Sequence, residues 1–416
     1  MKKFLATVLV VISWVWLQAD NISERIRLNG FLSQGYIYTT DNDLIPNSGK
    51  NGSFEFSEMG LTFSVDVSER LSIGVQFLSR DYGSVGNFDV KLDWAFADYN
   101  FSDAFGIRFG KIKTPIGFFN TIRDIDSLRP LALLPQAVYD EHMRPVFTAH
   151  NGIDIYGNLD LGEIGLLDYV IFCGTVNHPS AQDAPYILQI QQTINSQLNP
   201  NGLNLADIRF DNELFYGGRL ILDLEKIGFR IGGTYVYHNA RMSATLQNIV
   251  PGLGLYPFNT LPVTGHMELS NCFFLSAELR VGNLHLVSEY MELLPELRLA
   301  LFTPEEQVFD DDTMQGWYAM GSFMFGDRLT LTAVYERFLG KKNDPKGTGA
   351  LEDGNPAFFG WRHDLTAGIR YDISFNWTLK LEYHIIDGLS KSYLFSDPDD
   401  YQQKWNMLIA KFSFNF

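Results

Sequence analysis

The sequence offers its clearest chemistry between residues 110 and 150, where basic side chains that could bind small anions stand close together. The five basic candidates in this segment are Lys111, Lys113, Arg123, Arg129 and Arg144. Arginine suits such a site because its planar guanidinium pairs with carboxylate or phosphate through parallel hydrogen bonds. Four acids are interleaved with them, and local ion pairing to these acids is the alternative: Asp124, Asp126, Asp140 and Glu141.

The position of this segment decides between the two roles, and its composition indicates that it lies inside the protein. Residues 114–149 are too rich in leucine to remain free in water as an ordinary surface loop. Four prolines stiffen the segment and prevent a regular strand, namely Pro115, Pro130, Pro135 and Pro145. We therefore expect it to fold inward and narrow a passage, where its basic side chains would select passing ions.

The elements that must position this segment are β-strands with one apolar and one polar face. In NWTLKLEYHI (376–385), every second side chain is apolar and the others are polar or charged. Alternation of this length is typical of strands. About sixteen strands are predicted, at residues 26–40, 53–67, 70–80, 88–101, 104–113, 150–159, 164–173, 213–224, 228–238, 266–281, 283–293, 314–326, 328–338, 362–373, 376–387 and 404–416.

The connections between these strands alternate between tight turns and long loops almost throughout. One long connection contains the only helical periodicity we find, at residues 187–198. Tight turns at one end and long loops at the other are typical of outer-membrane barrels, which keep both termini on the tight-turn side. The predicted fold class is therefore all-β: a transmembrane antiparallel β-barrel of about sixteen strands, with the long third loop folded into the lumen.

Both ends of the chain agree with this architecture. Residues 1–19 begin with two lysines, continue with a short apolar run and end on a small residue, which is typical of a secretory signal peptide. An uncleaved anchor is the alternative. The barrel domain is then expected to span residues 20–416. The last predicted strand ends in FSFNF, so we expect it to face lipid, to close the barrel and to be recognised by the barrel-assembly machinery through Phe416.

On a membrane barrel the polar face of each strand lines the lumen, because charged side chains are costly against lipid. The alternation predicts that Leu379, Leu381 and Phe412 face lipid. It places three charged residues toward water: Lys380, Glu382 and Lys411. The basic candidates for the lumen wall are Arg108, Arg219, Arg230, Arg280, Arg370 and Lys380. A hydrated channel follows from this pattern, although any single wall residue could equally form an ion pair across strands.

Composition and motifs argue against several other functions. Acidic residues outnumber basic ones by 49 to 32, which argues against a nucleic-acid partner. Cys173 and Cys272 lie in separate strand-like runs and are expected to be ordinary apolar side chains rather than a disulfide or a metal pair. The sequence contains neither a Gly-x-Ser-x-Gly elbow nor a His-Glu-x-x-His motif. We therefore expect no catalysis, no cofactor and no metal.

Two stretches resemble a known family. FGKIKTPIGFFNTIRDIDSLRP (109–130) and the opening LNGFLSQGYIY (28–38) are similar to phosphate-selective porins of the O and P type. The resemblance implies a homotrimeric channel in the outer membrane of a Gram-negative-type bacterium, surrounded by outer-membrane lipids. It also implies passive diffusion of small hydrophilic solutes, including anions such as phosphate. The arginine ladder of phosphate-selective members has no residue-by-residue match here, so we expect a weak anion preference or a nearly unselective pore.

Two other functions remain open on the sequence alone. A non-conducting adhesin or structural barrel would use the long loops as a binding surface, because a fold does not determine a function. An outer-membrane enzyme would need a nucleophile or an acid beside one of the eight histidines. A stiff, inward-folded third loop favours the channel over both.

Overall fold

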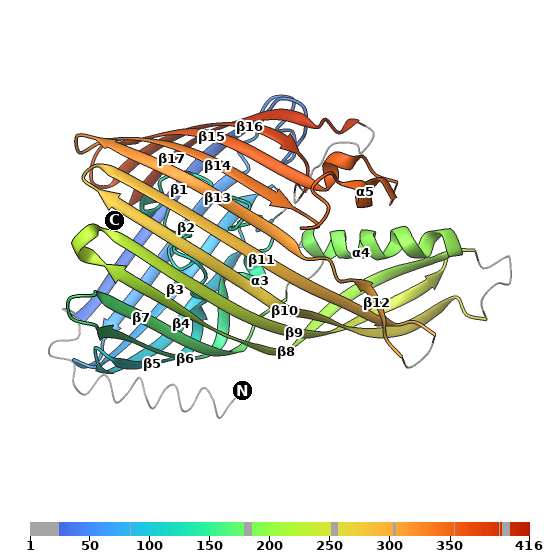
Figure 1. Ribbon diagram of the computed structural model, residues 1–416, viewed down its shortest axis with the longest axis horizontal. Coiled ribbons are helices and arrows are strands. Elements are labelled where there is room, and N and C mark those ends of the chain that lie inside the picture. The colour runs from blue at the N-terminus through green and yellow to red at the C-terminus, as the bar shows by residue number, and fades with distance from the viewer. Residues whose placement is uncertain are drawn as a thin grey trace.

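The alternating segments form a closed wall of antiparallel strands. The computed structural model describes residues 25–83, 85–178, 185–250, 257–302, 305–352, 354–390, 392 and 400–416. The predicted signal peptide, residues 1–19, lies outside the described residues. Strands that follow one another in the chain pair around the barrel, and β1 (Ile26–Thr39) pairs with β17 (Lys404–Asn415), so the sheet closes on itself (Figure 1).

Sixteen strands of the described chain form the wall, as predicted. A further four-residue strand, β12 (Gln307–Asp310), pairs with the far end of β11, which itself pairs directly with β13. The other wall strands are β2 (Phe56–Asp66), β3 (Leu71–Tyr82), β4 (Val90–Ser102), β5 (Phe105–Lys113), β6 (Ala149–Asp160), β7 (Leu166–Thr175), β8 (Leu203–Leu224), β9 (Phe229–Asn248), β10 (Thr260–Val281), β11 (Leu284–Ala300), β13 (Met314–Phe325), β14 (Leu329–Leu339), β15 (Trp361–Asp372) and β16 (Trp377–Gly388).

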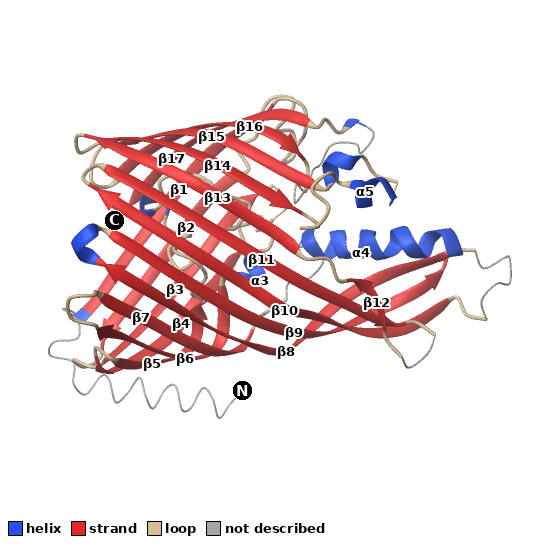
Figure 2. Ribbon diagram, in the orientation of Figure 1, coloured by secondary structure: helices blue, strands red, loops and turns tan. Residues whose placement is uncertain are grey.

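The two ends of the barrel differ, because tight turns gather at one end and long connections at the other. Figure 2 shows α4 (Pro185–Leu198) and α5 (Thr348–Glu352) at the long-loop end, whereas the shorter α3 (Arg144–Phe147) belongs to the third loop. The helical periodicity at residues 187–198 is thus confirmed as α4. Within the described residues, no helix is long and apolar enough to cross a membrane.

The predicted inward and outward faces are confirmed on the last strands. Leu381 and Phe412 are 40% and 42% exposed on the outer surface, while the lumen-facing charges are 1% exposed each, namely Lys380, Glu382 and Lys411. Their predicted contact with water is wrong, however. The third loop covers all three, so they are buried between the wall and the loop.

The closing strand is tied to the first strand at its last residue. The backbone N–H of Phe416 donates to the carbonyl of Gly30, and the N–H of Gly30 donates back to Phe416, each at 3.0 Å. A side chain at position 30 would meet the Phe416 ring, so glycine leaves the space that the ring occupies. On the outer face, Phe412 and Phe414 pack on Trp377 of β16 with ring centroids 4.8 and 4.5 Å apart. The predicted aromatic closing strand is therefore present.

Strands β8 to β11 extend much further than predicted. Their far ends form a sheet that projects beyond the rest of the barrel, and α4 lies along it (Figure 1). Ile187, Ile194 and Leu198 of α4 are buried in one apolar cluster with strand residues such as Leu205 and Met242. Irregular register between β8 and β9, and between β9 and β10, interrupts the alternation there, which explains why these segments were predicted as loops.

Candidate functional site in the barrel lumen

The third loop, residues 114–149, folds into the lumen and contacts strands on several sides of it. The Thr234 hydroxyl on β9 donates to the carbonyl of Pro115 at 3.1 Å, and the N–H of Phe118 donates to Glu289 on β11 at 2.9 Å. Farther along the loop, the N–H of Ala137 donates to Glu336 on β14 at 3.0 Å. The predicted inward fold of the loop is confirmed, and the loop spans the barrel instead of lying along one wall.

A group of buried charges fastens the loop to β2, β16 and β17, and we call it the ionic anchor: Glu58, Asp126, Arg129, Lys380 and Lys411. Glu58 of β2 pairs with Arg129 at 2.8 Å and with Lys411 at 2.5 Å. Asp126 of the loop pairs with Arg129 at 2.8 Å and with Lys380 at 2.9 Å. Each cation therefore has a carboxylate, which is what allows such charges to be buried.

The charge state of Asp126 follows from these neighbours. Burial by itself would raise the pKa of Asp126, because it penalises the charged form. The cations Lys380, Lys411 and Arg129 outweigh that effect and hold the pKa of Asp126 well below its ordinary value. Asp126 also accepts a hydrogen bond from the Ser413 hydroxyl at 2.7 Å. Asp126 is thus ionised at neutral pH and joins the loop to the closing strand.

A second set of ion pairs fastens the loop to β3 and β4. Glu141 of the loop pairs with Arg80 of β3 at 2.7 Å and with Arg123 at 2.8 Å. Lys113 pairs with Asp93 of β4 at 2.6 Å. Asp124 joins the Lys113 pair to the Glu141 pairs. It accepts hydrogen bonds from Lys113 and from Arg144, and Arg144 in turn lies 3.6 Å from Glu141. Burial alone would raise the pKa of Glu141, but Arg123 and Arg80 lower it below its ordinary value.

The opposite side of the loop packs mainly through apolar and aromatic side chains, and we call it the apolar side. Ile116, Phe119 and Val138 belong to a buried cluster that continues onto the inner faces of β10 to β14. The packing is close, since a cavity of only about 20 Å³ remains where loop and wall meet beside Met291. Two carboxylates lie within this region. Glu336 accepts from the Ala137 N–H, and Glu289 accepts from the hydroxyls of Tyr139, Tyr318 and Ser276 at 2.5, 2.6 and 2.5 Å.

Four of the five predicted constriction residues come together in the lumen, and all four are buried: Lys113, Arg123, Arg129 and Arg144. The alternative of local ion pairing is confirmed for the three arginines, which contact Glu141, Asp126 and Asp124 respectively. Lys111 lies apart from them. It is only partly buried on β5, and its ammonium donates to the carbonyl of Leu92 at 2.5 Å.

The predicted wall residues divide into two groups. Lys380 is buried in the ionic anchor, and Arg370 donates to the loop carbonyls of Ser127 and Arg129 at 2.7 and 3.1 Å. The other four lie toward the tight-turn end and keep solvent contact: Arg108, Arg219, Arg230 and Arg280. We call these four the arginine wall.

Carboxylates accompany most of the arginine wall. Arg108 pairs with Asp98 at 2.9 Å, and its guanidinium lies 4.0 Å from the centroid of the Tyr156 ring. Glu278 pairs with Arg230 at 2.9 Å and with Arg280 at 2.6 Å. Arg219 differs, because its hydrogen bond runs to the carbonyl of Gly117 in the loop at 3.4 Å. The arginine wall is therefore hydrated and mixed in charge. Arg219 is the member for which the described contacts include no salt bridge.

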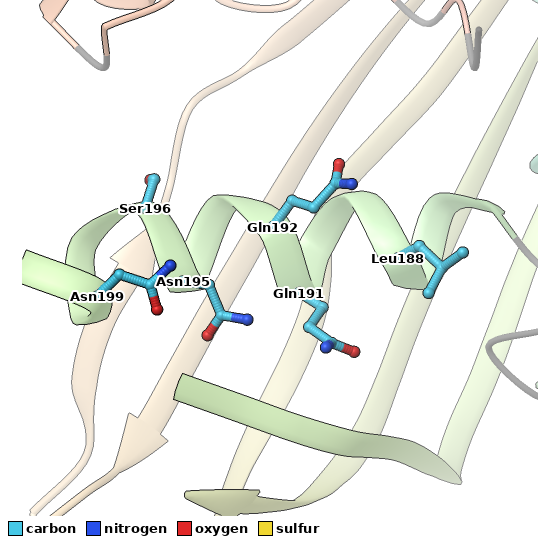
Figure 3. A pocket seen from close by; sticks show the side chains of 6 residues that line it. All are labelled: Leu188, Gln191, Gln192, Asn195, Ser196 and Asn199. Carbon is cyan, nitrogen blue, oxygen red and sulfur yellow. The ribbon is translucent and has the colours of Figure 1, made fainter. Parts of the chain in front are cut away.

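Sequence reasoning missed the polar surface of α4 at the long-loop end. An open cavity of about 470 Å³ lies along it, lined by uncharged side chains: Leu188, Gln191, Gln192, Asn195, Ser196 and Asn199 (Figure 3). Amides both donate and accept hydrogen bonds, so this surface can contact neutral polar solutes near the mouth of the barrel. The spacing of these residues on one helix face was the available signal. In the part of the chain that is described, no three His, Cys, Asp or Glu side chains converge as a metal site.

Comparison with known sequences does not assign the chain to a family. No family model matches the chain. An uncharacterised protein of Aquifex aeolicus is 24% identical over 140 residues, which cover 34% of this chain. The match spans 31% of that relative, or about a third of its length.

Comparison with solved structures identifies the fold. OmpF of Salmonella typhi, in complex with daunomycin, superposes with a TM-score of 0.56 at 12% identity, covering 94% of this chain and 97% of that one. An anion-selective porin from Comamonas acidovorans gives 0.55 at 12% identity, covering 94% and 99%. The outer membrane channel DcaP of Acinetobacter baumannii gives 0.53 at 11% identity, covering 94% and 97%. At such identities the likeness shows the porin fold, and membership of the phosphate-selective family stays a prediction.

Proposed function

We propose that this protein is a porin-type channel of a Gram-negative-type outer membrane, through which small hydrophilic solutes diffuse passively and without catalysis. The observation that carries the proposal is the contrast between the two faces of the wall. The outer face presents residues such as Leu381 and Phe412, and the inner face presents charged side chains on strand after strand. Charges on the inner face need water or a partner, and near the tight turns they keep contact with water.

The filter that this structure supports differs from the one expected at the loop. Buried, paired guanidiniums do not touch a passing ion, so the role we assign to Arg123, Arg129 and Arg144 is to hold the loop in place. The arginine wall is accessible to solutes, and its acids reduce its net charge. We therefore propose that the pore has a weak preference for small anions, such as phosphate, and does not bind phosphate tightly.

Assembly and targeting belong to the same proposal. The aromatic closing strand that ends at Phe416 supports recognition by barrel-assembly machinery. OmpT of Vibrio cholerae, which has a similar fold with a TM-score of 0.51, is described in a trimer form. A homotrimer is accordingly the assembly we propose for this chain, embedded in outer-membrane lipids.

Single-channel recording in a planar lipid bilayer tests the function. We expect discrete conductance steps, and a reversal potential in a salt gradient that indicates weak anion preference. Replacing Arg219 by Gln should shift the reversal potential toward cations, because this guanidinium donates to the Gly117 carbonyl and forms no salt bridge among its described contacts, although Asp168 acts on it electrostatically. Replacing Arg123 by Gln should not produce a comparable shift in selectivity. Absence of any conductance from correctly folded protein would overturn the channel proposal.

One observation favours a second candidate function. The third loop is attached on many sides of the lumen and leaves little space where it meets β10 to β14, which would suit a closed barrel used for adhesion or structural support. Such a barrel would bind a surface partner through α4 and the long connections. Folded protein that never conducts, even at high voltage, would favour this role.

A further inference from the structure

Two imidazoles and one side-chain amide converge on the wall between the third loop and the long-loop end. His238 lies on β9, four positions beyond Thr234, whose hydroxyl contacts the loop. His178 follows β7, in the connection that leads to α4, and Asn212 lies on β8. Three segments far apart in sequence thus bring nitrogen and oxygen donors to one place, and no role in the proposed channel accounts for them.

The distances match those between ligands of one metal ion. The Nε2 atoms of His178 and His238 are 3.2 Å apart, and Oδ1 of Asn212 is 2.9 Å from Nε2 of His238. Imidazole nitrogens bind Zn²⁺ at 2.0–2.1 Å, so two of them on one ion lie roughly 2.8–3.4 Å apart for angles between a right angle and the tetrahedral value. Little movement of either ring is needed to accept an ion.

Hydrogen bonding leaves His238 and Asn212 incompletely satisfied. A proton on Nε2 of His238 is shared between Oδ1 of Asn212 and Nε2 of His178, whereas a proton on Nε2 of His178 instead leaves Oδ1 of Asn212 without a donor from His238. Within the described residues, Nδ1 of His238 and Nδ2 of Asn212 are buried without a hydrogen-bond partner. A cation in place of that proton would contact all three converging atoms at once.

The surroundings hold the rings in position. Phe215 contacts the His238 ring with centroids 6.0 Å apart, and Phe210 contacts the His178 ring at 5.4 Å. His238 is fully buried whereas His178 keeps partial exposure, so an ion has access from the side of His178. Asp211 is the acid close enough to act on His178 electrostatically, and its negative charge favours a cation.

We propose that His178, His238 and Asn212 form a binding site for a divalent transition-metal ion. Imidazole selects Zn²⁺, Ni²⁺ or Cu²⁺ over Mg²⁺ and Ca²⁺, which prefer oxygen ligands. Two nitrogens and one amide oxygen leave at least one coordination position for water. The site is independent of whether the barrel conducts, because it depends only on the folded wall and the His178 segment.

Metal titration of the full folded chain in detergent tests this proposal. After exhaustive removal of bound metal with a chelator, Zn²⁺ is the probe in isothermal titration calorimetry and Cu²⁺ is the probe in electron paramagnetic resonance. We expect one ion per chain, and a Cu²⁺ spectrum with coupling to two imidazole nitrogens. Replacing His178 by Gln should weaken Zn²⁺ binding by at least about tenfold, since even indirect ligand partners cost that much.

His363→Gln is the matched control, because this imidazole is also half-buried but lies on β15 beside Tyr335, away from His178 and His238. It should leave Zn²⁺ binding unchanged. His178 is partly exposed, so its replacement should fold, and heat-modifiable migration on a gel confirms the barrel. His238→Gln is a second variant of the site. If it fails to fold, the H178Q variant and the Cu²⁺ spectrum still test whether the metal site exists. No saturable Zn²⁺ binding, equal binding by H178Q and wild type, or a spectrum with fewer than two nitrogens would each overturn the site.

Discussion

The two sides of the third loop are attached by different physics. The ionic anchor joins the loop to β2, β16 and β17 through buried charges, whereas the apolar side packs on β10 to β14 through side chains such as Phe119 and Val138. Apolar packing depends on shape and tolerates changes in pH. A buried ion pair depends on both partners, because removing one leaves the other charged and without water. The loop therefore has one robust attachment and one that a single substitution or a proton can release.

The largest effect should come from breaking the ionic anchor. Replacing Glu58 by Gln leaves Arg129 and Lys411 sharing Asp126, and we expect loop attachment to weaken by about 3–5 kcal/mol. Limited trypsin digestion after Arg123 measures this, because Arg123 is 2% exposed and should be resistant while the loop is attached. Arg129 and Arg144 precede prolines and are not cleaved. The rate of cleavage at Arg123 should rise steeply in E58Q barrels. Equal resistance in variant and wild type would contradict the anchor.

A comparable but somewhat smaller effect is expected from the apolar side. Leu134 is 1% exposed within the apolar cluster, and Leu134→Ala should cost about 2–5 kcal/mol through lost burial and a residual cavity. The loss should be the same at pH 8 and pH 5, because no charge is involved. Urea unfolding at both pH values measures it. A loss that changed strongly with pH would mean that the two attachments are not separate.

Acid should weaken the ionic side of the loop only at low pH. The pKa values of Asp126 and Glu141 are lowered in the folded state, so their contribution to attachment is complete above the ordinary carboxyl pKa of about 4. That contribution is lost only as pH falls below this value toward the folded-state pKa. We expect hydrogen exchange around Asp126, after correction for intrinsic rates, to be faster at pH 2 than at pH 5. Equal exchange at these two pH values would contradict the role of ionised Asp126 in holding the loop.

The smallest effect should come from an ion pair outside the lumen. Arg298 pairs with Glu296 at 2.8 Å on the projecting sheet, and both side chains are partly exposed. Arg298→Gln should leave the urea midpoint of unfolding nearly unchanged, because water already solvates both charges. Trypsin resistance at Arg123 should remain that of the wild type. A large loss of stability here would show that burial is not what distinguishes the ionic anchor.

Alternation along the strands was sufficient to predict the barrel, because each wall strand has one face in lipid and the other inside. It failed on β8 to β11 beyond the barrel, where irregular register interrupts the period of two. The apolar composition of the loop predicted its inward fold. Its partners were not predictable, since Lys411 and Glu58 are 353 positions apart and only the closed barrel brings them together. Local acids near each loop arginine made both of its roles equally compatible with the sequence.

The pairing of β1 with β17 has a consequence for the order in which this protein can acquire its structure. These two strands are the first and last of the wall, so neither finds its final neighbour until the whole chain is available. Until then each presents a row of unpaired N–H and C=O groups that invites pairing with another chain. Contacts between such distant positions form slowly. The interval before closure is thus when the chain is most exposed to aggregation and most in need of a chaperone.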